Sequence, residues 1–293
     1  MKKIIPNSLG CYDNSMKPAV LICAKRGKKA AREAAIELAK WLKRRGHESI
    51  DVTESDNKLT KASLKAVGLG VIIGGDGTFL TLVRRLERKD QFPLMGVNLG
   101  TLGFITEFGQ EEMLGSVRDV LDQKYNEELR RMLQVELWRA GKCVESGIVF
   151  NDAALTKDAR TSMLKLDVEV GDEHLSYVRA DGYLVSTPTG STAYSLSAGG
   201  PLLHPEVSGT VLVPICSHSL STRPIIIPTQ SKVQITLREF SGGAAYLVFD
   251  GQINFEVQPA DLIRIQSAKS SLRLIRSPKQ KWSETIRSKL QMS

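Results

Sequence analysis

The residues best suited to chemistry in this chain form one short stretch, Gly74-Gly75-Asp76-Gly77-Thr78. It follows an apolar run at 71–73 and precedes a segment with helical spacing at 79–89, so it predicts a strand, a tight turn and a helix. Glycines let a backbone approach a ligand closely, and the amides that open a helix attract anions. Gly74, Gly75, Gly77 and Thr78 are therefore candidate phosphate-binding residues.

The carboxylate of Asp76 stands in the middle of this predicted anion site. A negative side chain among phosphate oxygens is unfavourable unless it takes a proton, orients a hydroxyl or holds a metal ion. Asp76 is therefore a candidate proton acceptor in a phosphoryl transfer. The simpler alternative is that Asp76 caps the helix and the glycines only form the turn.

A second candidate binding stretch, residues 180–201, is long, poor in charge and rich in glycine and hydroxyl-bearing side chains. Such residues can hold a polar ligand through amides and hydroxyls, and Tyr194 offers an aromatic face to a base. A surface loop rich in serine and threonine is the simpler alternative. The sequence Gly-x-x-x-x-Gly-Lys-Ser/Thr occurs nowhere in the chain, which excludes a P-loop nucleotidase.

The elements that must position these stretches follow from the hydrophobic pattern. Continuous apolar runs predict buried parallel strands, and amphipathic segments predict helices between them. The strands are expected at 19–23, 49–52, 69–73 and 93–97, and the helices at 29–46, 79–89 and 111–124. A second glycine-rich loop, residues 98–104, follows the last strand, at the edge where open α/β sheets bind ligands, although it could be a purely structural turn. Residues 1–128 are therefore expected to form a Rossmann-like α/β domain.

From about residue 130 the pattern changes to short segments of alternating polarity, which predict antiparallel strands. Examples lie at 133–138, 164–170 and 233–237. Residues 129–271 are therefore expected to form a β-rich domain of the β-sandwich type. In the tail, Trp282, Ile286 and Leu290 have helical spacing. We expect residues 272–293 to end in a helix that packs back and joins the α/β domain.

Composition limits the classes of function. Of 293 residues, 42% are hydrophobic and 25% charged, which is typical of a two-domain soluble protein, and no apolar run approaches the roughly 20 residues of a membrane helix. The N-terminus lacks the pattern of a secretory signal, and the four cysteines lack metal-ligand spacing, so we expect a cytoplasmic protein with reduced thiols. These cysteines are Cys11, Cys23, Cys143 and Cys216.

The net charge of +8 favours anionic partners. Basic residues gather between Lys25 and Arg45 and at the C-terminus, without a zinc finger, a helix-turn-helix or aromatic and basic residues in alternation. We therefore expect attraction of phosphate-bearing small molecules, and neither a nucleic-acid nor a membrane partner.

Together, the motifs closely resemble those of the NAD kinases. Residues 74–78 resemble the Gly-Gly-Asp-Gly-Thr loop of that family, residues 98–104 its Asn-x-Gly-x-x-Gly-Phe segment, and residues 181–201 its longest signature. Further similar segments are Asn151-Asp152, residues 217–224 and Asp250-Gly251-Gln252. The resemblance runs in order from about residue 70 to residue 252 and more weakly toward both ends.

The resemblance implies an ATP-dependent kinase that transfers the γ-phosphate of ATP to the 2′-hydroxyl of the adenosine ribose of NAD, which makes NADP. By similarity, Asp76 contacts NAD and accepts the hydroxyl proton, and Gly77 is a close backbone contact. The other NAD-binding residues implied by similarity are Asn151, Asp152, Arg179, Asp181, Thr192, Ala193, Tyr194, Ser195, Leu196, Ser197 and Gln252. The resemblance also implies that Mg²⁺ or another divalent ion accompanies ATP without direct protein ligands. Members of the family are typically homodimers or homotetramers, so we expect a homo-oligomer.

Three positions depart from the family pattern. Asp152 stands where many members have glutamate, Ser217 where they often have proline, and Ser162 where some have a basic or imidazole side chain. We therefore expect no NAD contact from Ser162.

Two other functions share part of this pattern. A lipid kinase of the diacylglycerol or sphingosine type has the same Gly-Gly-Asp-Gly-Thr loop, but the polar stretch at 189–197 argues against a lipid acceptor. A non-catalytic dinucleotide sensor would have no need of the carboxylate of Asp76. The sequence leaves open whether NADH is an acceptor and whether polyphosphate can replace ATP.

Overall fold

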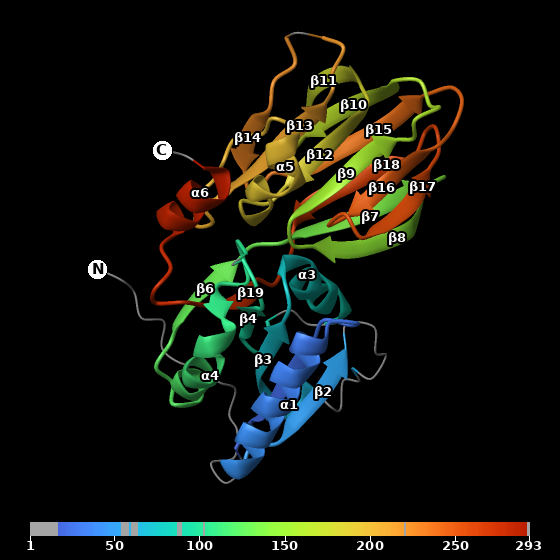
Figure 1. Ribbon diagram of the computed structural model, residues 1–293. Coiled ribbons are helices and arrows are strands. Elements are labelled where there is room, and N and C mark those ends of the chain that lie inside the picture. Colours follow the sequence, from blue (N-terminus) through green and yellow to red (C-terminus); the bar gives the residue numbers. More distant parts are fainter. Residues whose placement is uncertain are drawn as a thin grey trace. The chain divides into compact units, whose positions relative to one another are not determined.

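Strands that are apolar along most of their length form the centre of the first part of the chain (Figure 1). In this computed structural model, which describes residues 17–53, 59, 64–86, 90–101, 103–219 and 221–291, seven strands form one sheet. Its order is β2-β1-β3-β4-β19-β6, with β5 paired to β4. The strands are β1 (Ala19–Ala24), β2 (Ser49–Thr53), β3 (Val67–Ile73), β4 (Leu94–Asn98), β5 (Phe108–Gly109), β6 (Asn126–Arg130) and β19 (Leu272–Arg276). Every residue of β1 and β3 is buried, which fits parallel strands covered on both faces.

Amphipathic helices belong to the same compact unit as this sheet. They are α1 (Lys29–Arg44), α3 (Asp76–Arg85), α4 (Met113–Leu121) and α6 (Trp282–Leu290), with a 3-10 turn, η1 (Gln110–Glu112), before α4. The helices predicted near 29–46 and in the tail are confirmed. Helix α3 begins at Asp76, three residues before its predicted start, because Gly75 is extended and serves as the N-cap. Asp76 therefore opens a helix at the carboxyl end of β3.

Two antiparallel sheets of six strands form the second part of the chain (Figure 1). Their orders are β11-β10-β15-β18-β7-β8 and β14-β13-β12-β9-β16-β17. The first sheet consists of β7 (Leu133–Arg139), β8 (Lys142–Val149), β10 (Leu164–Val170), β11 (Glu173–Ala180), β15 (Val233–Glu239) and β18 (Leu262–Ser267). The second consists of β9 (Asp152–Lys157), β12 (Gly182–Ser186), β13 (Gly209–Ile215), β14 (Ile225–Pro228), β16 (Ala245–Phe249) and β17 (Ile253–Val257), and two short helices, η2 (Thr189–Thr192) and α5 (Tyr194–Ser197), follow β12.

The core of this second part comes from the alternation seen in the sequence. Along β7, β10 and β15 buried apolar residues alternate with more exposed polar ones, and Val135, Leu166 and Ile235 belong to one buried cluster. The predicted fold class, an α/β domain followed by a β-sandwich-type domain, is confirmed.

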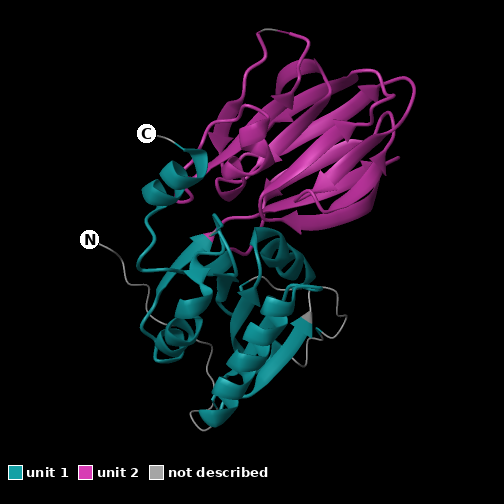
Figure 2. Ribbon diagram, viewed as in Figure 1, with its two compact units in different colours: residues 1–129, 272–293 teal, residues 130–271 magenta. Residues whose placement is uncertain are grey.

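The chain divides into two compact units, the described residues of 1–129 with 272–293, and residues 130–271 (Figure 2). The C-terminal segment belongs to the first unit, where Leu274 of β19 pairs in parallel with Leu94 of β4. Among the described residues, no helix is long and apolar enough to cross a membrane. The predictions that concern the N-terminus, Cys11, Leu102 and Leu220 lie outside the described residues.

Candidate functional site

The carboxylate of Asp76 is held by the segment that follows β4. Its Oδ1 accepts hydrogen bonds from the amides of Ile105 (3.3 Å) and Thr106 (3.0 Å) and from the Thr106 hydroxyl (2.8 Å). Its Oδ2 accepts one from the amide of Phe104 at 2.9 Å. The two glycine-rich loops, which follow β3 and β4, are therefore joined by this one side chain.

The side-chain amide of Asn98 fixes the direction of the hydrogen bond from the Thr106 hydroxyl. Asn98 Nδ2 donates to Thr106 Oγ1 at 3.0 Å, and Asn98 Oδ1 accepts from the amide of Gly100 at 2.9 Å. Because the Thr106 hydroxyl accepts from Asn98, its own proton is directed to Asp76 Oδ1. Among the described residues Asp76 Oδ2 has a single donor, so this oxygen has an open position for one more proton.

Open space lies beside two of the candidate phosphate-binding glycines. Among the described residues, a Cβ at Gly75 or Gly77 would meet no atom within 4 Å. Both residues lie at the N-terminus of α3, a helix of ten residues, where backbone amides favour an anion. At Gly103, by contrast, a Cβ would lie 2.1 Å from Asp76 Oδ1, so only glycine lets the second loop approach the carboxylate.

Gly74 and Thr78 make the turn itself tight. The amide of Gly74 donates to the carbonyl of Val97 at 2.9 Å, which links the end of β3 to β4. A Cβ at Gly74 would lie 2.6 Å from the hydroxyl oxygen of Thr78, which is buried. Both residues therefore shape the loop from within.

In the second unit, the carboxylate of Asp250 holds the backbone of Asn151 and Asp152. Asp250 Oδ1 accepts from the amides of Asn151 (2.7 Å) and Asp152 (3.1 Å), and Oδ2 accepts from the amide of Phe150 (2.9 Å). The Asp250 amide donates back to the carbonyl of Asp152 at 2.9 Å. Asp250 has a φ of 48°, in the left-handed region that few residues other than glycine occupy.

Asp250 had no separate role in the sequence-based prediction. It drew attention only as part of a segment that resembles the family. The signal that could have found it is aspartate followed by glycine directly after a strand, which marks a turn with special backbone angles. Here the turn between β16 and β17 presents a carboxylate to three consecutive amides.

Burial alters the protonation of Asp152. Asp152 is 3% exposed, and burial, followed by the charge of Asp250, raises the pKa of its carboxyl to about 7. In the same unit Asn151 Oδ1 and Ser195 Oγ are buried, and no described residue forms a hydrogen bond with either atom. Because a buried polar atom without a partner is costly, both atoms are suited to the polar groups of a ligand.

The hydroxyl-rich stretch is packed into the unit and is not a surface loop. Its buried hydroxyl residues include Thr187, Thr189, Ser191 and Ser195. Thr187 Oγ1 donates to the carbonyl of Phe150 at 2.7 Å, and a Cβ at Gly190 would lie 2.1 Å from the carbonyl oxygen of Asn151. The stretch therefore lies directly against the Asn151-Asp152 segment.

Tyr194 lies among acidic groups. Its side chain is 43% exposed. Partial burial raises the pKa of its phenol, and electrostatic interaction with the acidic groups of Cys216, Asp152 and Asp181 raises that pKa further. The Asp181 carboxylate also lies 3.6 Å from Lys157 Nζ. An accessible ring bordered by carboxylates can stack on a base and bind hydroxyl or amide groups.

The remaining predicted contact residues belong to the same unit. Thr192 and Ala193 precede α5, and Leu196 and Ser197 belong to it. Arg179 is exposed on β11, where its carbonyl accepts from the amide of His218 at 2.9 Å. Gln252 is exposed in the β16–β17 turn. Ser162 forms two 2.8 Å hydrogen bonds with Ser241, which gives it a structural role.

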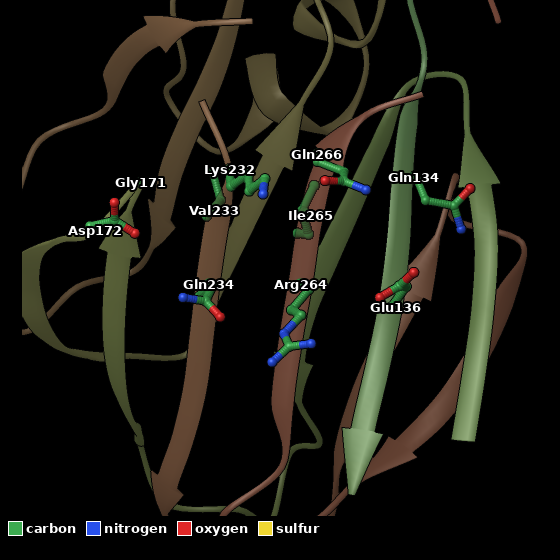
Figure 3. A pocket seen from close by; sticks show the side chains of 10 residues that line it. All are labelled: Gln134, Glu136, Gly171, Asp172, Lys232, Val233, Gln234, Arg264, Ile265 and Gln266. Carbon is green, nitrogen blue, oxygen red and sulfur yellow. The ribbon is translucent and has the colours of Figure 1, made fainter. Parts of the chain in front are cut away.

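The outer face of one sheet carries a shallow hollow away from these residues (Figure 3). It has a volume of about 340 Å³, and its lining includes Glu136, Lys232 and Arg264 but none of the predicted site residues. In the described ranges, no three His, Cys, Asp or Glu side chains come together as a cation site. The candidate residues form two groups, the Asp76 loops in one unit and the Asn151, Asp152 and Tyr194 cluster in the other.

Comparison with known sequences identifies both halves of the chain. The profile of the ATP-NAD kinase N-terminal domain matches residues 59–125, and that of the C-terminal domain matches residues 150–277. An NAD kinase of Geotalea daltonii is 39% identical over 267 residues, which cover 87% of this chain and 92% of the relative. An NAD kinase of Neisseria meningitidis serogroup C is 40% identical over 222 residues, 76% of this chain and 74% of the relative.

Solved structures give the same result for the fold. Yeast NADH kinase complexed with NADH matches with a TM-score of 0.85 and 26% identity, covering 95% of this chain and 89% of that one. An NAD kinase from Archaeoglobus fulgidus in complex with ATP matches with a TM-score of 0.73 over 93% of this chain and 98% of that one. At 21% identity this second likeness is one of fold alone.

Proposed function

This chain belongs to the NAD kinase family, and from that premise we propose how each of its units serves the reaction. The enzyme transfers the γ-phosphate of ATP to the 2′-hydroxyl of the adenosine ribose of NAD, which makes NADP. The observation that carries this function is the presence of both family domains in one chain, the first with its Gly-Gly-Asp-Gly-Thr carboxylate held in place.

The first unit binds the donor phosphates and receives the proton. The open backbone at Gly75 and Gly77, at the start of α3, is where the donor's terminal phosphates bind. Asp76 Oδ2 orients the ribose hydroxyl and accepts its proton. Because a carboxylate is a much weaker base than an alkoxide, the proton moves late, as bond formation to phosphorus proceeds.

The second unit recognises NAD. Asn151 Oδ1 and Ser195 Oγ, which are buried without partners among the described residues, bind polar groups of the dinucleotide. Tyr194 stacks on a ring of NAD, and Asp152 and Asp181 bind hydroxyl or amide groups around it. The other members of the proposed NAD site are Gly77, Arg179, Thr192, Ala193, Leu196, Ser197 and Gln252.

A divalent ion, Mg²⁺ in the simplest case, is proposed as part of the donor substrate. The family resemblance implies no direct protein ligands for this ion, so the triphosphate of ATP would hold it. Its contribution would be to neutralise phosphate charge, and none of the steps assigned to protein residues passes through it.

We also propose that the enzyme is a homodimer or homotetramer in the cytoplasm. Large apolar side chains are exposed on two edge strands, Leu175 and Tyr177 on β11 and Ile225 and Ile226 on β14, which favours association. The exposed, unpaired thiols of Cys143 and Cys216 are typical of a reducing compartment. Sedimentation equilibrium tests the first proposal, where a monomer at all concentrations would contradict it, and cell fractionation tests the second.

The function is tested by incubating the enzyme with Mg-ATP and NAD and measuring NADP with an NADP-specific dehydrogenase. NADP should accumulate with time and enzyme concentration, and heat-denatured enzyme should give none. A parallel reaction with diacylglycerol as acceptor should give no phosphorylated lipid. Binding of NAD without formation of NADP would instead indicate a sensor.

A further inference from the structure

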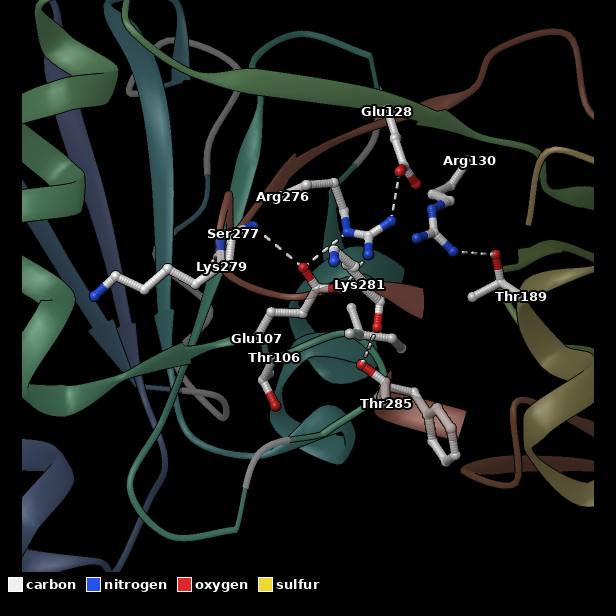
Figure 4. A network of polar contacts seen from close by, with 12 residues as sticks. Thr106, Glu107, Glu128, Arg130, Thr189, Arg276, Ser277, Lys279, Lys281 and Thr285 are labelled. Atoms are coloured by element: carbon white, nitrogen blue, oxygen red, sulfur yellow. Dashed lines mark hydrogen bonds and ion pairs between the residues drawn. The ribbon is translucent and has the colours of Figure 1, made fainter. Parts of the chain in front are cut away.

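A buried ion pair lies directly beside the segment that holds Asp76 (Figure 4). Glu107, which follows Thr106 in the chain, is 3% exposed. Its Oε2 accepts from Arg276 Nε at 2.7 Å and from the amide of Ser277 at 3.1 Å, and its Oε1 lies 2.7 Å from Arg276 Nη2. Building on the proposed role of Asp76, we propose that Arg276 is a positioning residue for the catalytic carboxylate.

The link is a short run of backbone. Three of the four hydrogen bonds to Asp76 come from the amides of Phe104, Ile105 and Thr106. These residues lie between β4 and β5 and belong to no helix or strand, so regular structure does not fix their amides. Glu107 is the next residue, and both of its carboxylate oxygens are engaged by the segment that ends β19. Anchoring Glu107 therefore anchors the amides that aim the Asp76 carboxylate.

The position of Arg276 is itself fixed from a second side. Its Nη1 donates to Glu128 Oε1, on β6, so the guanidinium lies between two carboxylates. A planar guanidinium that binds both oxygens of Glu107 restricts distance and angle together, which a lysine ammonium cannot do. Replacing a buried ion pair by well-packed apolar residues is often neutral or stabilising, so stability alone does not account for this one.

The chain supplies a matched control on the same strand. Arg273, also on β19, donates from Nε and Nη2 to the two oxygens of Glu127 on β6, at 2.7 and 2.8 Å. This pair is also largely buried, with side chains 13% and 19% exposed. It joins the same two strands by the same chemistry but has no contact with residues 104–107 among its described hydrogen bonds.

The experiment compares Arg276→Gln with Arg273→Gln in the 293-residue enzyme. For each variant, kcat and KM for NAD are measured per folded molecule, with the folded fraction taken from the thermal unfolding curve. Hydrogen exchange of the amides of Phe104, Ile105 and Thr106 is followed in parallel. Arg276→Gln should lower kcat by about tenfold or more, the range of a misplaced proton acceptor, with KM for NAD changed less than about twofold.

Exchange should be faster at those three amides in Arg276→Gln and unchanged in Arg273→Gln, which should also keep its kcat. Arg276→Lys, which retains the charge without the planar fork, should recover part of kcat. Equal kcat for Arg276→Gln and Arg273→Gln at matched stability, or unchanged exchange at 104–106, overturns the proposal.

If Arg276→Gln does not fold, Glu107→Gln replaces it, since glutamine keeps the shape and one acceptor oxygen. The same loss of kcat and the same faster exchange are then expected, and their absence overturns the proposal. A wild-type enzyme that made no NADP would contradict the proposed function, whereas the exchange measurement tests the anchor without any turnover.

Discussion

At the scale of residues, the carboxylate of Asp76 has two separate tasks. Oδ1 takes three donors and ties the loop after β4 to the start of α3, whereas Oδ2 takes one and has room for the proton of a substrate. A substitution at Asp76 therefore alters both the chemistry and the loop. The two effects are distinguished by measuring turnover together with the order of the loop.

Asp76→Asn should lower kcat by at least about 10²-fold, because an amide cannot accept the ribose proton. KM for NAD should change much less, since the proposed NAD contacts other than Asp76 and Gly77 belong to the second unit. Initial rates of NADP formation at varied NAD measure both constants, and amide exchange at 104–106 reports whether the loop stays ordered. Unchanged turnover would exclude Asp76 as the proton acceptor.

Asp152 should give the fold a pH dependence of its own. In the native state its carboxyl has a pKa of about 7, against 3.8 for an ordinary aspartate, so the native state keeps a proton that the unfolded chain has released. The stabilising contribution is therefore complete below about pH 4 and is lost as the pH rises to about 7.

Asp152→Asn is neutral at every pH and should remove this contribution. The fall in melting temperature between about pH 5 and pH 8 should therefore be smaller in Asp152→Asn than in the wild type. Thermal unfolding across this range measures the difference. Parallel curves for the two proteins would mean that Asp152 is ionised throughout.

At the scale of elements, each unit uses one acidic side chain to hold a neighbouring loop. Asp76 at the start of α3 gathers the amides of the loop after β4, and Asp250 in the β16–β17 turn gathers those at the start of β9. In both cases an aspartate fixes backbone amides of a loop or of the first residue of a strand. The proposed binding residues next to these amides are therefore carried by backbone that is held in place.

Asp250→Asn should weaken NAD binding without affecting phosphoryl transfer directly. Asparagine tolerates the left-handed φ of 48°. Its side chain has only one oxygen that can accept hydrogen bonds from the amides, so Asn151 and Asp152 lose part of their anchor. KM for NAD should rise by about five- to tenfold, the equivalent of roughly one hydrogen bond, with kcat nearly unchanged. Asp172→Asn, in the exposed turn between β10 and β11, is the control and should leave both constants unaltered.

At the scale of the whole molecule, the end of the chain completes the first unit. Strand β19 pairs with β4, and Leu272, Leu274 and Ile275 are buried at 1% exposure or less. Deleting residues 272–293 exposes this apolar surface and removes the partner of Glu107.

The truncated enzyme should lose the first unit while the second keeps its fold. Calorimetry of the 293-residue and truncated proteins should show that truncation removes one part of the unfolding enthalpy. Far-UV circular dichroism should lose more helix signal than strand signal. NADP formation should be abolished. A truncated enzyme with full activity would contradict the structural role of β19.

The sequence was sufficient for the fold class, because the buried parallel strands are continuously apolar and the antiparallel ones alternate. The sequence was less reliable at the boundaries of elements. Helix α3 begins at Asp76 and not at 79, because Gly75 is extended and caps the helix, and hydrophobic periodicity does not detect a glycine cap. The raised pKa of Asp152 was also invisible, because it depends on burial and on Asp250 arriving from a distant strand.

By itself, then, the sequence determined the reaction through its resemblance to the NAD kinases, because the Gly-Gly-Asp-Gly-Thr loop and the long hydroxyl-rich signature are local patterns that one stretch of chain can carry. Only the tertiary structure decided how these residues are held. Asp76 depends on Thr106, Thr106 adjoins Glu107, and Glu107 is bound by Arg276 from the last strand. Such contacts join residues far apart in sequence, and no local pattern encodes them because they arise only when the sheet has assembled.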